Sequence, residues 1–230
     1  MTDLFYRAFE ERYYATREVI KTLRRQYLPF VEPLKCINSA LRVFDIGCGR
    51  GEWLELMIES GFDACGMDLD EGMLEACYIK GLPAEKGDAV KYLMKLKDKS
   101  HAVISAFHVV EHLSHEYLHV VVREALRVLI PGGLLILETP NPENINVATK
   151  NFYLDPTHQR PIPPELMSFL PEYYGFKRVK VLRLNESRNL TENDSQNLYD
   201  VINGVSPDYS VIAQKAAPKK IMAIFDQAFN

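Results

Sequence analysis

The chain has 230 residues, which is long for one small domain and short for two large ones. Hydrophobic residues make up 47% and charged residues 25%, a composition that excludes a disordered or low-complexity chain. The formal net charge of −4 leaves no basic excess to neutralise a phosphate backbone, so we expect no nucleic-acid partner.

The N-terminus and the cysteines favour a cytoplasmic protein. The first residues lack the basic and apolar regions of a signal peptide, and no apolar run reaches the roughly 18 residues of a membrane span. None of the four cysteines belongs to a Cys-x-x-Cys pair, which is typical of reduced thiols. We therefore expect a cytoplasmic protein without a membrane span.

The chain begins with a predicted amphipathic helix and continues with alternating strands and helices. Apolar residues recur every three to four positions from Leu4 to Tyr27, and Pro29 is expected to end this helix. The alternation that follows predicts βαβ units in a parallel sheet with helices on both faces. The predicted strands are 41–46, 62–67, 83–87, 102–107 and 134–138, and the predicted helices are 52–60, 71–80, 89–97 and 116–129.

After Thr139 the alternation stops. Residues 140–164 are rich in proline and have no period, which predicts a long functional loop. Beyond it the pattern predicts a helix at 165–174, a strand at 176–184, a helix at 195–203 and a last strand at 209–214 that runs antiparallel. The expected domains are a helical lid or extension over 1–38, one α/β domain over 39–215, and a linker or the start of a further segment over 216–230.

The most informative motif lies between the first predicted strand and helix, where Asp45 precedes Gly47, Gly49 and Gly51. Glycines at such a turn let the backbone approach a ligand closely. A dinucleotide site would have the spacing G-x-G-x-x-G, whereas here it is G-x-G-x-G. The carboxylate of Asp45 would repel a pyrophosphate and attract an ammonium group.

Two further acids follow the next strands. Asp68 ends the second strand, where a carboxylate can accept both ribose hydroxyls, and Asp88 follows the third, where it can accept an adenine amine. A ligand with an ammonium, a ribose and an adenine is S-adenosylmethionine.

These motifs resemble class I S-adenosylmethionine-dependent methyltransferases, whose Rossmann-like fold has a seven-stranded, mostly parallel sheet with an antiparallel last strand. The resembling motifs are D-x-G-C-G-x-G, G-x-D and G-D-A, the last ending at Ala89. Two flanking segments, F-E-E-R-Y-Y-A-T-R-E and T-P-N-P-E-N…N-F-Y-L-D-P-T-H, resemble a bacterial subgroup linked to O-antigen and other surface-polysaccharide synthesis.

The resemblance implies a set of residues that bind the cofactor. The glycine loop would line its methionine part, Leu69 would pack on the adenine, and the end of the fourth strand would face the sulfonium. Arg17 is a candidate clamp for the cofactor carboxylate. The implied set is Arg17, Asp45, Gly47, Cys48, Gly49, Gly51, Asp68, Leu69, Asp88, Ala89, Phe107 and His108.

Two histidines are candidates for catalysis. A hydroxyl acceptor must lose a proton, and histidine titrates in the useful range. His158 lies in the proline-rich loop with Asp155 placed to orient it, and His112 follows the fourth strand. Asn141, Asn144 and Asn151 are candidate donors to sugar hydroxyls, although asparagine also simply forms turns.

The sequence predicts an O-methyltransferase for a sugar hydroxyl of a bacterial surface glycan, with partners reached through the C-terminal tail. One alternative is a methyltransferase for a small metabolite such as a quinone precursor. The H-x-x-E-H motif of His108 to His112 suggests a zinc peptidase instead. Because His108 directly follows a strand, the motif should not lie on one helix, and we expect no metal site. A non-catalytic scaffold is the remaining alternative.

Overall fold

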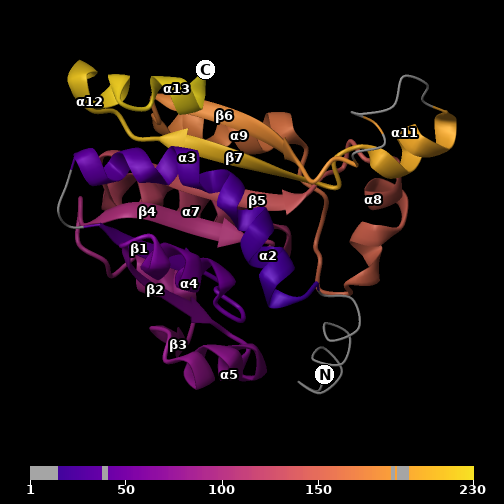
Figure 1. Cartoon of the computed structure of the whole chain (residues 1–230), viewed down its shortest axis with the longest axis horizontal. Coiled ribbons are helices and arrows are strands. Elements are labelled where there is room, and N and C mark those ends of the chain that lie inside the picture. Colours follow the sequence, from indigo (N-terminus) through magenta and orange to yellow (C-terminus); the bar gives the residue numbers. More distant parts are fainter. Residues whose placement is uncertain (1–14, 38–40, 188–189, 191–196) are drawn as a thin grey trace.

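The structure is a computed structural model that describes residues 15–37, 41–187, 190 and 197–230 (Figure 1). Residues 4–14 of the predicted leading helix and residues 195–196 of a later helix lie outside the described residues. The strands are β1 (Arg42–Ile46), β2 (Asp63–Asp68), β3 (Ala84–Lys86), β4 (His101–Phe107), β5 (Leu129–Pro140), β6 (Arg178–Leu184) and β7 (Asp208–Gln214).

The seven strands form one sheet in the order β3-β2-β1-β4-β5-β7-β6. Strands β1 to β5 are parallel to one another, and β7 is antiparallel to both β5 and β6. This confirms the predicted Rossmann-like sheet with an antiparallel last strand. In a parallel sheet the carboxyl ends of the strands meet at one edge, which is where ligands bind in open α/β folds.

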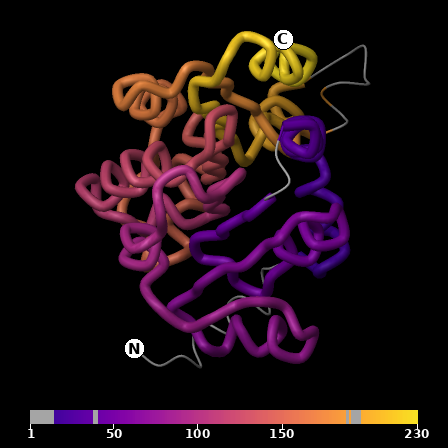
Figure 2. The backbone as a smooth tube through the Cα atoms, turned by 90° about the vertical axis from the view of Figure 1, so that its left-hand side faces the viewer, coloured from indigo at the N-terminus to yellow at the C-terminus, as the bar shows by residue number. Residues whose placement is uncertain are grey.

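Helices cover both faces of the sheet (Figure 2). On one face the core contains side chains of the N-terminal helices, α4, α5 and the C-terminal segment, and on the other it contains side chains of α6, α7 and α9. These helices are α2 (Arg17–Arg24), η1 (Arg25–Tyr27), α3 (Leu28–Val31), η2 (Glu32–Cys36), α4 (Glu52–Glu59), α5 (Glu71–Lys80), α6 (Ala89–Leu93), α7 (His115–Val128) and α9 (Pro164–Tyr174).

Pro29 does not end the leading helical segment, contrary to the prediction. It lies in the first turn of α3, where a proline costs little because its missing N–H would have no partner. The segment therefore continues as helical turns to Cys36, and Tyr27, Val31 and Leu34 are fully buried against the sheet. The described part of this extension belongs to the domain core.

The proline-rich loop contains structure that the sequence pattern did not reveal. It contains the short helix α8 (Ile145–Thr149), followed by η4 (Asn151–Leu154). Another short turn, η3 (Val110–His112), follows β4. Asn144 caps α8 by accepting a hydrogen bond from the Val147 N–H at 3.1 Å. Helices of one turn are too short to show a hydrophobic period, which explains the missed prediction.

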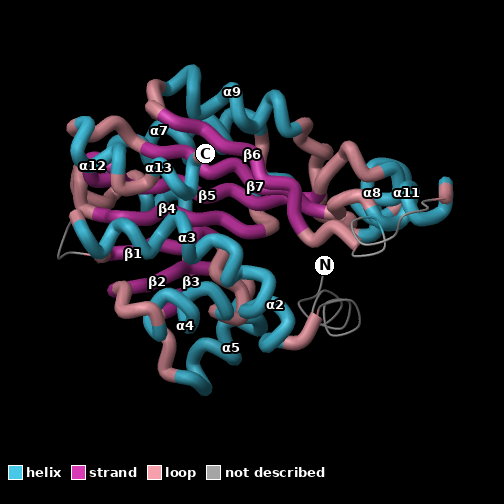
Figure 3. Tube along the Cα trace, turned by 45° about the horizontal axis from the view of Figure 1, so that its top comes forward, coloured by secondary structure: helices cyan, strands magenta, loops and turns pink. Residues whose placement is uncertain are grey.

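Helices α8 and α11 (Leu198–Gly204) lie side by side beyond the carboxyl edge of the sheet (Figures 1 and 3). The Asn146 side chain joins them, donating to the Ile202 carbonyl at 3.1 Å and to Asn203 at 2.9 Å. This pair of helices extends the molecule on the side where the site residues gather.

The tail predicted as a linker packs back onto the domain. It forms α12 (Lys219–Ala223) and α13 (Asp226–Phe229), and Phe225 between them is fully buried. The Phe229 ring lies 5.5 Å from that of Phe30, and Arg178 of β6 donates to the Met222 carbonyl. Met222 and Phe225 are therefore buried residues, which a short amphipathic stretch at the end of a chain does not reveal.

Among the described residues, no helix has the length and apolar character that crossing a membrane requires.

Candidate active site

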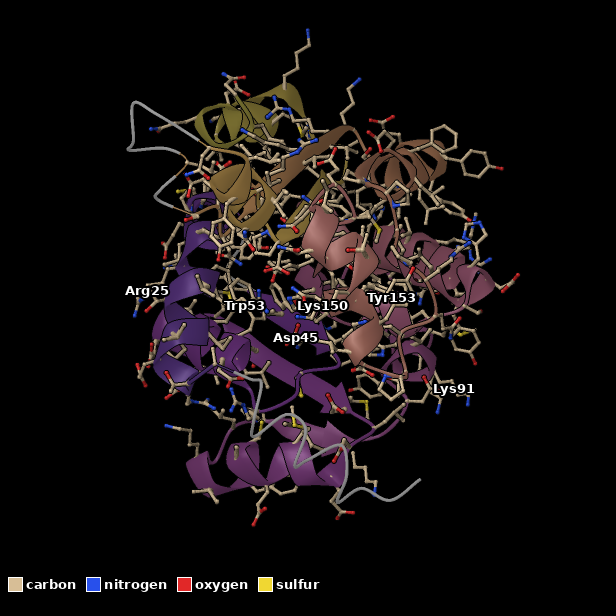
Figure 4. The ribbon with its side chains drawn as sticks, turned by 90° about the vertical axis from the view of Figure 1, so that its right-hand side faces the viewer. Arg25, Asp45, Trp53, Lys91, Lys150 and Tyr153 are labelled. Atoms are coloured by element: carbon tan, nitrogen blue, oxygen red, sulfur yellow. The ribbon has the colours of Figure 1, made fainter. Side chains whose placement is uncertain are left out.

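The predicted cofactor residues gather at the carboxyl edge of β1, β2 and β4. β1 and β2 pair from Arg42–Asp63 to Ile46–Met67, so the residues that follow these strands lie next to each other. Figure 4 looks onto this region, with Asp45 and Trp53 near the middle of the view and Lys150 and Tyr153 in the same part of it.

The glycine loop uses its own N–H groups to hold its shape. The N–H groups of Gly47 and Cys48 both donate to the Met67 carbonyl, at 2.9 and 3.1 Å. The Gly49 N–H donates to the Asp68 carboxylate at 2.8 Å, and the Gly51 N–H donates to the Cys48 carbonyl. These donors are therefore engaged inside the protein, unlike those of a loop that cradles a pyrophosphate.

Glycine is required at position 51 for two reasons: the backbone conformation, and the lack of room for a side chain. It precedes α4 in the left-handed region, with φ +78°. A Cβ atom there would lie 2.6 Å from the Cys77 sulfur and 2.8 Å from a methyl of Leu82. Only glycine lets α4 begin this close to α5.

Asp45 is a buried carboxylate at the end of β1. Its Oδ1 accepts a hydrogen bond from the Ser105 hydroxyl of β4 at 2.6 Å. Burial raises the pKa of Asp45 to about 8, and the Ser105 hydrogen bond opposes that shift only in part. A cation placed beside Asp45 would restore its charge, so the environment favours a cationic ligand.

Asp68 connects β2 to the glycine loop. One oxygen accepts from the Gly49 N–H and the other from the Asp70 N–H, both at 2.8 Å. Each carboxylate oxygen can accept a second hydrogen bond, which leaves capacity for a ribose. Leu69, the next residue, is 72% exposed, an unusual position for a leucine at a strand end.

Asp88 caps α6, and Ala89 is buried directly after it. Asp88 accepts from the Lys91 N–H at 3.0 Å and pairs with the Lys91 ammonium, also at 3.0 Å. Although partial burial opposes it, these contacts lower the pKa of Asp88. Its contacts thus lie within its own helix.

The contacts of Arg17 and Cys48 differ from those that their predicted roles imply. Arg17 donates to Glu55 at 2.6 Å and to the carbonyls of Arg50 and Gly51 at 2.7 and 3.2 Å. The guanidinium therefore holds the glycine loop from the α2 side. The Cys48 side chain is buried in the core, so only its backbone can line a ligand.

Aromatic rings surround Phe107 at the end of β4. Its ring lies 5.4 Å from Tyr27 and 5.1 Å from Trp53, and the Arg24 guanidinium lies 4.1 Å above it. The indole N–H of Trp53 is buried and has no hydrogen-bond acceptor among the described residues. It is a free donor next to the glycine loop.

A buried ionic network lies beside this cluster, and the sequence analysis did not predict it. Glu138 of β5 accepts hydrogen bonds from Arg24 and Tyr27 of the N-terminal helices and contacts His108 at 3.1 Å. Burial would raise the pKa of Glu138, but Arg24 and His108 outweigh burial and lower it to about 2. The signal in the sequence was a lone acid in the apolar run LLILE.

His108 is a further member of this network. Its backbone has φ +55°, and its ring lies 3.4 Å from Glu111, 3.1 Å from Glu138 and 3.8 Å from Asp208. Burial would lower the pKa of His108, but hydrogen bonds to Glu111 and Glu138 and the charge of Asp208 raise it well above its usual value. Both ring nitrogens face carboxylates.

The H-x-x-E-H motif is therefore not a zinc-peptidase helix. His108 directly follows β4, His112 ends the 3₁₀ turn η3, and the two rings have different partners. In the peptidase motif both histidines project from one helix face onto one metal ion.

The two candidate catalytic histidines, which are 46 positions apart in the sequence, do meet. The ring centroids of His112 and His158 lie 4.7 Å apart. The loop is held to η3 by the Gln159 side chain, which donates to the His112 carbonyl at 2.7 Å. Buried Glu111 completes the group, with Oε1 3.9 Å from His158 Nε2.

Asp155 supports His112 rather than His158. Its Oδ1 accepts from the Thr157 hydroxyl at 2.7 Å, and that hydroxyl contacts His112 Nδ1 at 2.8 Å. Its Oδ2 lies 3.9 Å from His158 Nε2, whereas His158 Nδ1 donates to the Phe152 carbonyl at 2.6 Å. The sequence analysis gave no role to Glu111, although it is the glutamate of H-x-x-E-H, or to Thr157, because the contacts between this turn and the loop join segments far apart in the chain.

Two of the three asparagines have structural roles. Asn141 donates to the Ser206 carbonyl at 3.0 Å, and Asn144 donates to the Val205 carbonyl while it caps α8. Both side chains are buried, whereas Asn151 is exposed.

Comparison with known proteins identifies the family. A family model described as a methyltransferase domain matches residues 12–181. The chain belongs to this methyltransferase family. It is an enzyme family, and S-adenosylmethionine is the methyl donor.

Among solved structures, the methyltransferase is similar to an S-adenosylmethionine-dependent methyltransferase from Archaeoglobus fulgidus. The two are 34% identical with a TM-score of 0.78, over 92% of this chain and all of the other.

Curated relatives are more distant. A probable S-adenosylmethionine-dependent methyltransferase of Mycolicibacterium smegmatis is 29% identical over 67% of this chain and 59% of its own length. A ubiquinone biosynthesis O-methyltransferase of Bordetella avium is 29% identical over 50% of this chain and 48% of its own. The chain thus spans about half to three-fifths of these relatives.

Replacing Gly51 by alanine tests the close approach of α4 and α5. We expect Gly51→Ala to lower the free energy of unfolding by about 1–3 kcal/mol more than Gly61→Ala, because of overpacking against Cys77 and Leu82. Gly61 is a matched control, since its φ is +82° and a Cβ there meets nothing within 4 Å. If urea denaturation gives the two variants the same loss in the free energy of unfolding, the left-handed backbone conformation alone accounts for the effect.

Removing Arg24 tests the buried network. Arg24→Ala should lower the free energy of unfolding by roughly 3–5 kcal/mol at pH 7, because it leaves Glu138 buried without its main cation. The exposed neighbour Arg25 is the control, with an expected change within about 0.5 kcal/mol for Arg25→Ala.

The pH dependence of the Arg24→Ala effect follows from the lowered pKa of Glu138. Stability from a carboxylate with a lowered pKa is present above its unfolded value and is lost as pH falls toward 2. The difference between wild type and Arg24→Ala should therefore shrink as the pH is lowered from 7 toward 3. A constant difference would contradict this account.

Proposed function

We propose that this methyltransferase methylates a hydroxyl oxygen of an acceptor bound between η3 and residues 152–159. The observation that supports this proposal is the convergence of Glu111, His112 and His158 next to the end of β4. Three groups that can accept a hydrogen bond or a proton lie within 4.8 Å of one another. An acceptor hydroxyl must lose a proton, whereas a thioether acceptor has no proton to lose at the attacking atom.

The residues that we propose for the cofactor follow β1, β2 and β3. Asp45 would bind its ammonium group, Asp68 its ribose hydroxyls, and exposed Leu69 would cover the adenine. The backbone of Gly47, Cys48, Gly49 and Gly51 would line the methionine part. The free indole N–H of Trp53 suits the cofactor carboxylate better than Arg17, whose nitrogens contact Glu55 and two carbonyls.

S-adenosylmethionine supplies a methyl group on a sulfonium when it is bound. Held by Asp45, Asp68 and the glycine loop, it would supply this methyl group to the acceptor oxygen and would leave as the neutral thioether. His158 or His112 takes up the hydroxyl proton through Nε2. Their positions are held by the Phe152 carbonyl and by the Thr157–Asp155 pair.

We propose a sugar hydroxyl of a bacterial surface glycan as the acceptor. The flanking segments around residues 9–18 and 139–158 support it, and so does the polar character of the residues around His112. A phenolic quinone precursor is the second candidate, because relatives of this chain are ubiquinone biosynthesis O-methyltransferases.

Cofactor binding should release a proton at pH 7. The pKa of Asp45 is about 8 without a cation beside it, so most molecules must lose that proton when the cofactor ammonium binds. Affinity for S-adenosylhomocysteine should therefore fall by up to about tenfold for each pH unit below 8. The number of protons released on binding is measured by calorimetry in two buffers that differ in ionisation enthalpy.

The matched variant is Asp45→Asn, which cannot titrate. It should weaken S-adenosylhomocysteine binding by roughly 10- to 100-fold, the loss of one charge-assisted hydrogen bond, and should remove the proton release. Proton release that persists in Asp45→Asn would assign it to another group, such as Asp68.

Labelled-methyl transfer to an acceptor panel tests the activity. The panel contains lipid-linked sugars, free oligosaccharides and catechol-type phenols. With the acceptor that reacts, His112→Ala and His158→Ala should lower kcat by roughly 10²- to 10⁴-fold while S-adenosylhomocysteine binding stays within twofold. His119→Ala, a histidine on α7 that bonds Tyr174, should keep wild-type kcat.

If S-adenosylhomocysteine binds but no hydroxyl compound is methylated, O-methylation is wrong. If both histidine variants turn over at the wild-type rate, their assignment as proton acceptors is wrong.

A further inference from the structure

The group formed by Glu111, His112 and His158 has an unusual property: it contains acceptors and no donor. Glu111 is fully buried, and its Oε1 faces His108 Nδ1 at 3.4 Å and His158 Nε2 at 3.9 Å, without a well-aligned hydrogen bond from the described residues. The ion pair with His108 satisfies this buried oxygen only in part, so Oε1 can accept a further ligand.

The hydrogen bonds around the two histidines decide which ring nitrogens carry protons. His158 Nδ1 contacts the Phe152 carbonyl, which can only accept, so Nδ1 carries the proton. The Thr157 hydroxyl donates its one proton to Asp155, so it accepts from His112 Nδ1. In neutral rings, both Nε2 atoms are then lone-pair acceptors.

Two imidazole lone pairs and a carboxylate oxygen that face one another form the ligand set of a divalent cation. Two histidines and a glutamate are the protein ligands of many catalytic zinc sites, which keep one position open for water or substrate. Metal-binding histidines usually donate their other ring N–H to a carbonyl or a carboxylate-linked group. Phe152 and the Thr157–Asp155 pair occupy those positions here.

We propose that Glu111, His112 and His158 bind a divalent cation of the zinc type, at the acceptor end of the methyltransferase. Asp155 Oδ2, 3.9 Å from His158 Nε2, lies near enough to serve as a further oxygen ligand or to bond a bound water. The positive charge of His108 on the other side of Glu111 is balanced by Glu138 and Asp208.

The proposed cation site departs from the sequence analysis, which led us to expect no metal site. The H-x-x-E-H motif drew attention to His108, which belongs to the ionic network, and the second histidine ligand comes from a loop 46 positions further along. Only the packing of that loop on η3 brings the set together.

The role of the cation rests on the proposed O-methylation, although its binding does not. A cation here would bind the acceptor oxygen and lower the pKa of its hydroxyl, so that the proton passes to water instead of to a histidine. Acceptors with two adjacent oxygens, such as a sugar diol or a catechol, would be favoured because both oxygens can reach one cation.

Metal titration of the full chain tests the site without any acceptor. After dialysis against a chelator, we expect one equivalent of Zn²⁺ to bind by calorimetry, and one equivalent of Co²⁺ to give visible d–d absorption bands. His112→Ala, His158→Ala and Glu111→Gln should each weaken Zn²⁺ binding at least tenfold. S-adenosylhomocysteine binding shows whether each variant is folded.

The control is His119→Ala. His115 and His119 on α7 form the other close histidine pair, with Nε2 atoms 3.1 Å apart, and any adventitious zinc would bind there. Wild-type Zn²⁺ affinity in His119→Ala supports the proposed site. Zn²⁺ binding that is lost in His119→Ala but kept in His158→Ala overturns it.

The two proposals can fail separately. Methyl transfer to a hydroxyl at full rate in chelator, with no Zn²⁺ binding, would overturn the cation site and leave O-methylation standing. Zn²⁺ binding that depends on His112 and His158, with no hydroxyl acceptor methylated, would support the cation site and contradict O-methylation.

Discussion

The structure at the carboxyl ends of β4 and β5 depends on the ion pairs and hydrogen bonds of the buried Glu138 carboxylate. A charge in the interior is tolerated only when it is paired and hydrogen-bonded. Glu138 meets this condition through Arg24 and Tyr27 from the N-terminal helices and His108 from the end of β4. One charge thereby connects the leading helices, the central sheet and the turn that carries Glu111 and His112.

This network also divides the carboxyl edge into two regions. On the β1–β2 side, the environment of Asp45 favours a cation and the glycine loop has its N–H groups engaged, which suits a sulfonium cofactor with an ammonium group. On the β4–β5 side, lone pairs converge at Glu111, His112 and His158. Phe107 and its aromatic neighbours lie at the end of β4 between the two regions. The proposed function places the cofactor in the first region and the acceptor in the second.

Membership of the methyltransferase family accounts for the cofactor region more fully than for the acceptor region. The relatives carry names that range from an unspecified methyltransferase to a ubiquinone O-methyltransferase, and each aligns over only part of its own length. The acceptor therefore has to be inferred from the chemistry of the loop between β5 and α9. That loop is tied to η3 by Gln159, which makes its histidine part of the site rather than of the surface.

The sequence by itself determined the sheet and the order of its elements along the chain, because those features depend on local patterns, and the same patterns carry the prediction of the cofactor residues. Apolar strands, the glycine spacing and the acids after β1, β2 and β3 are all readable within a few residues of each other. Helix α5 was predicted with the same limits that the structure has, 71–80. Pro29, the short helix α8 and the packing of Phe225 escaped prediction because each depends on contacts with distant segments.

Only the tertiary structure decided that His108 pairs with Glu138, that Asp155 acts through Thr157 on His112, and that His112 meets His158 and Glu111. Hydrogen bonds and ion pairs between segments far apart in the chain leave no period or motif, so their partners are known only once the strands have brought them to one edge.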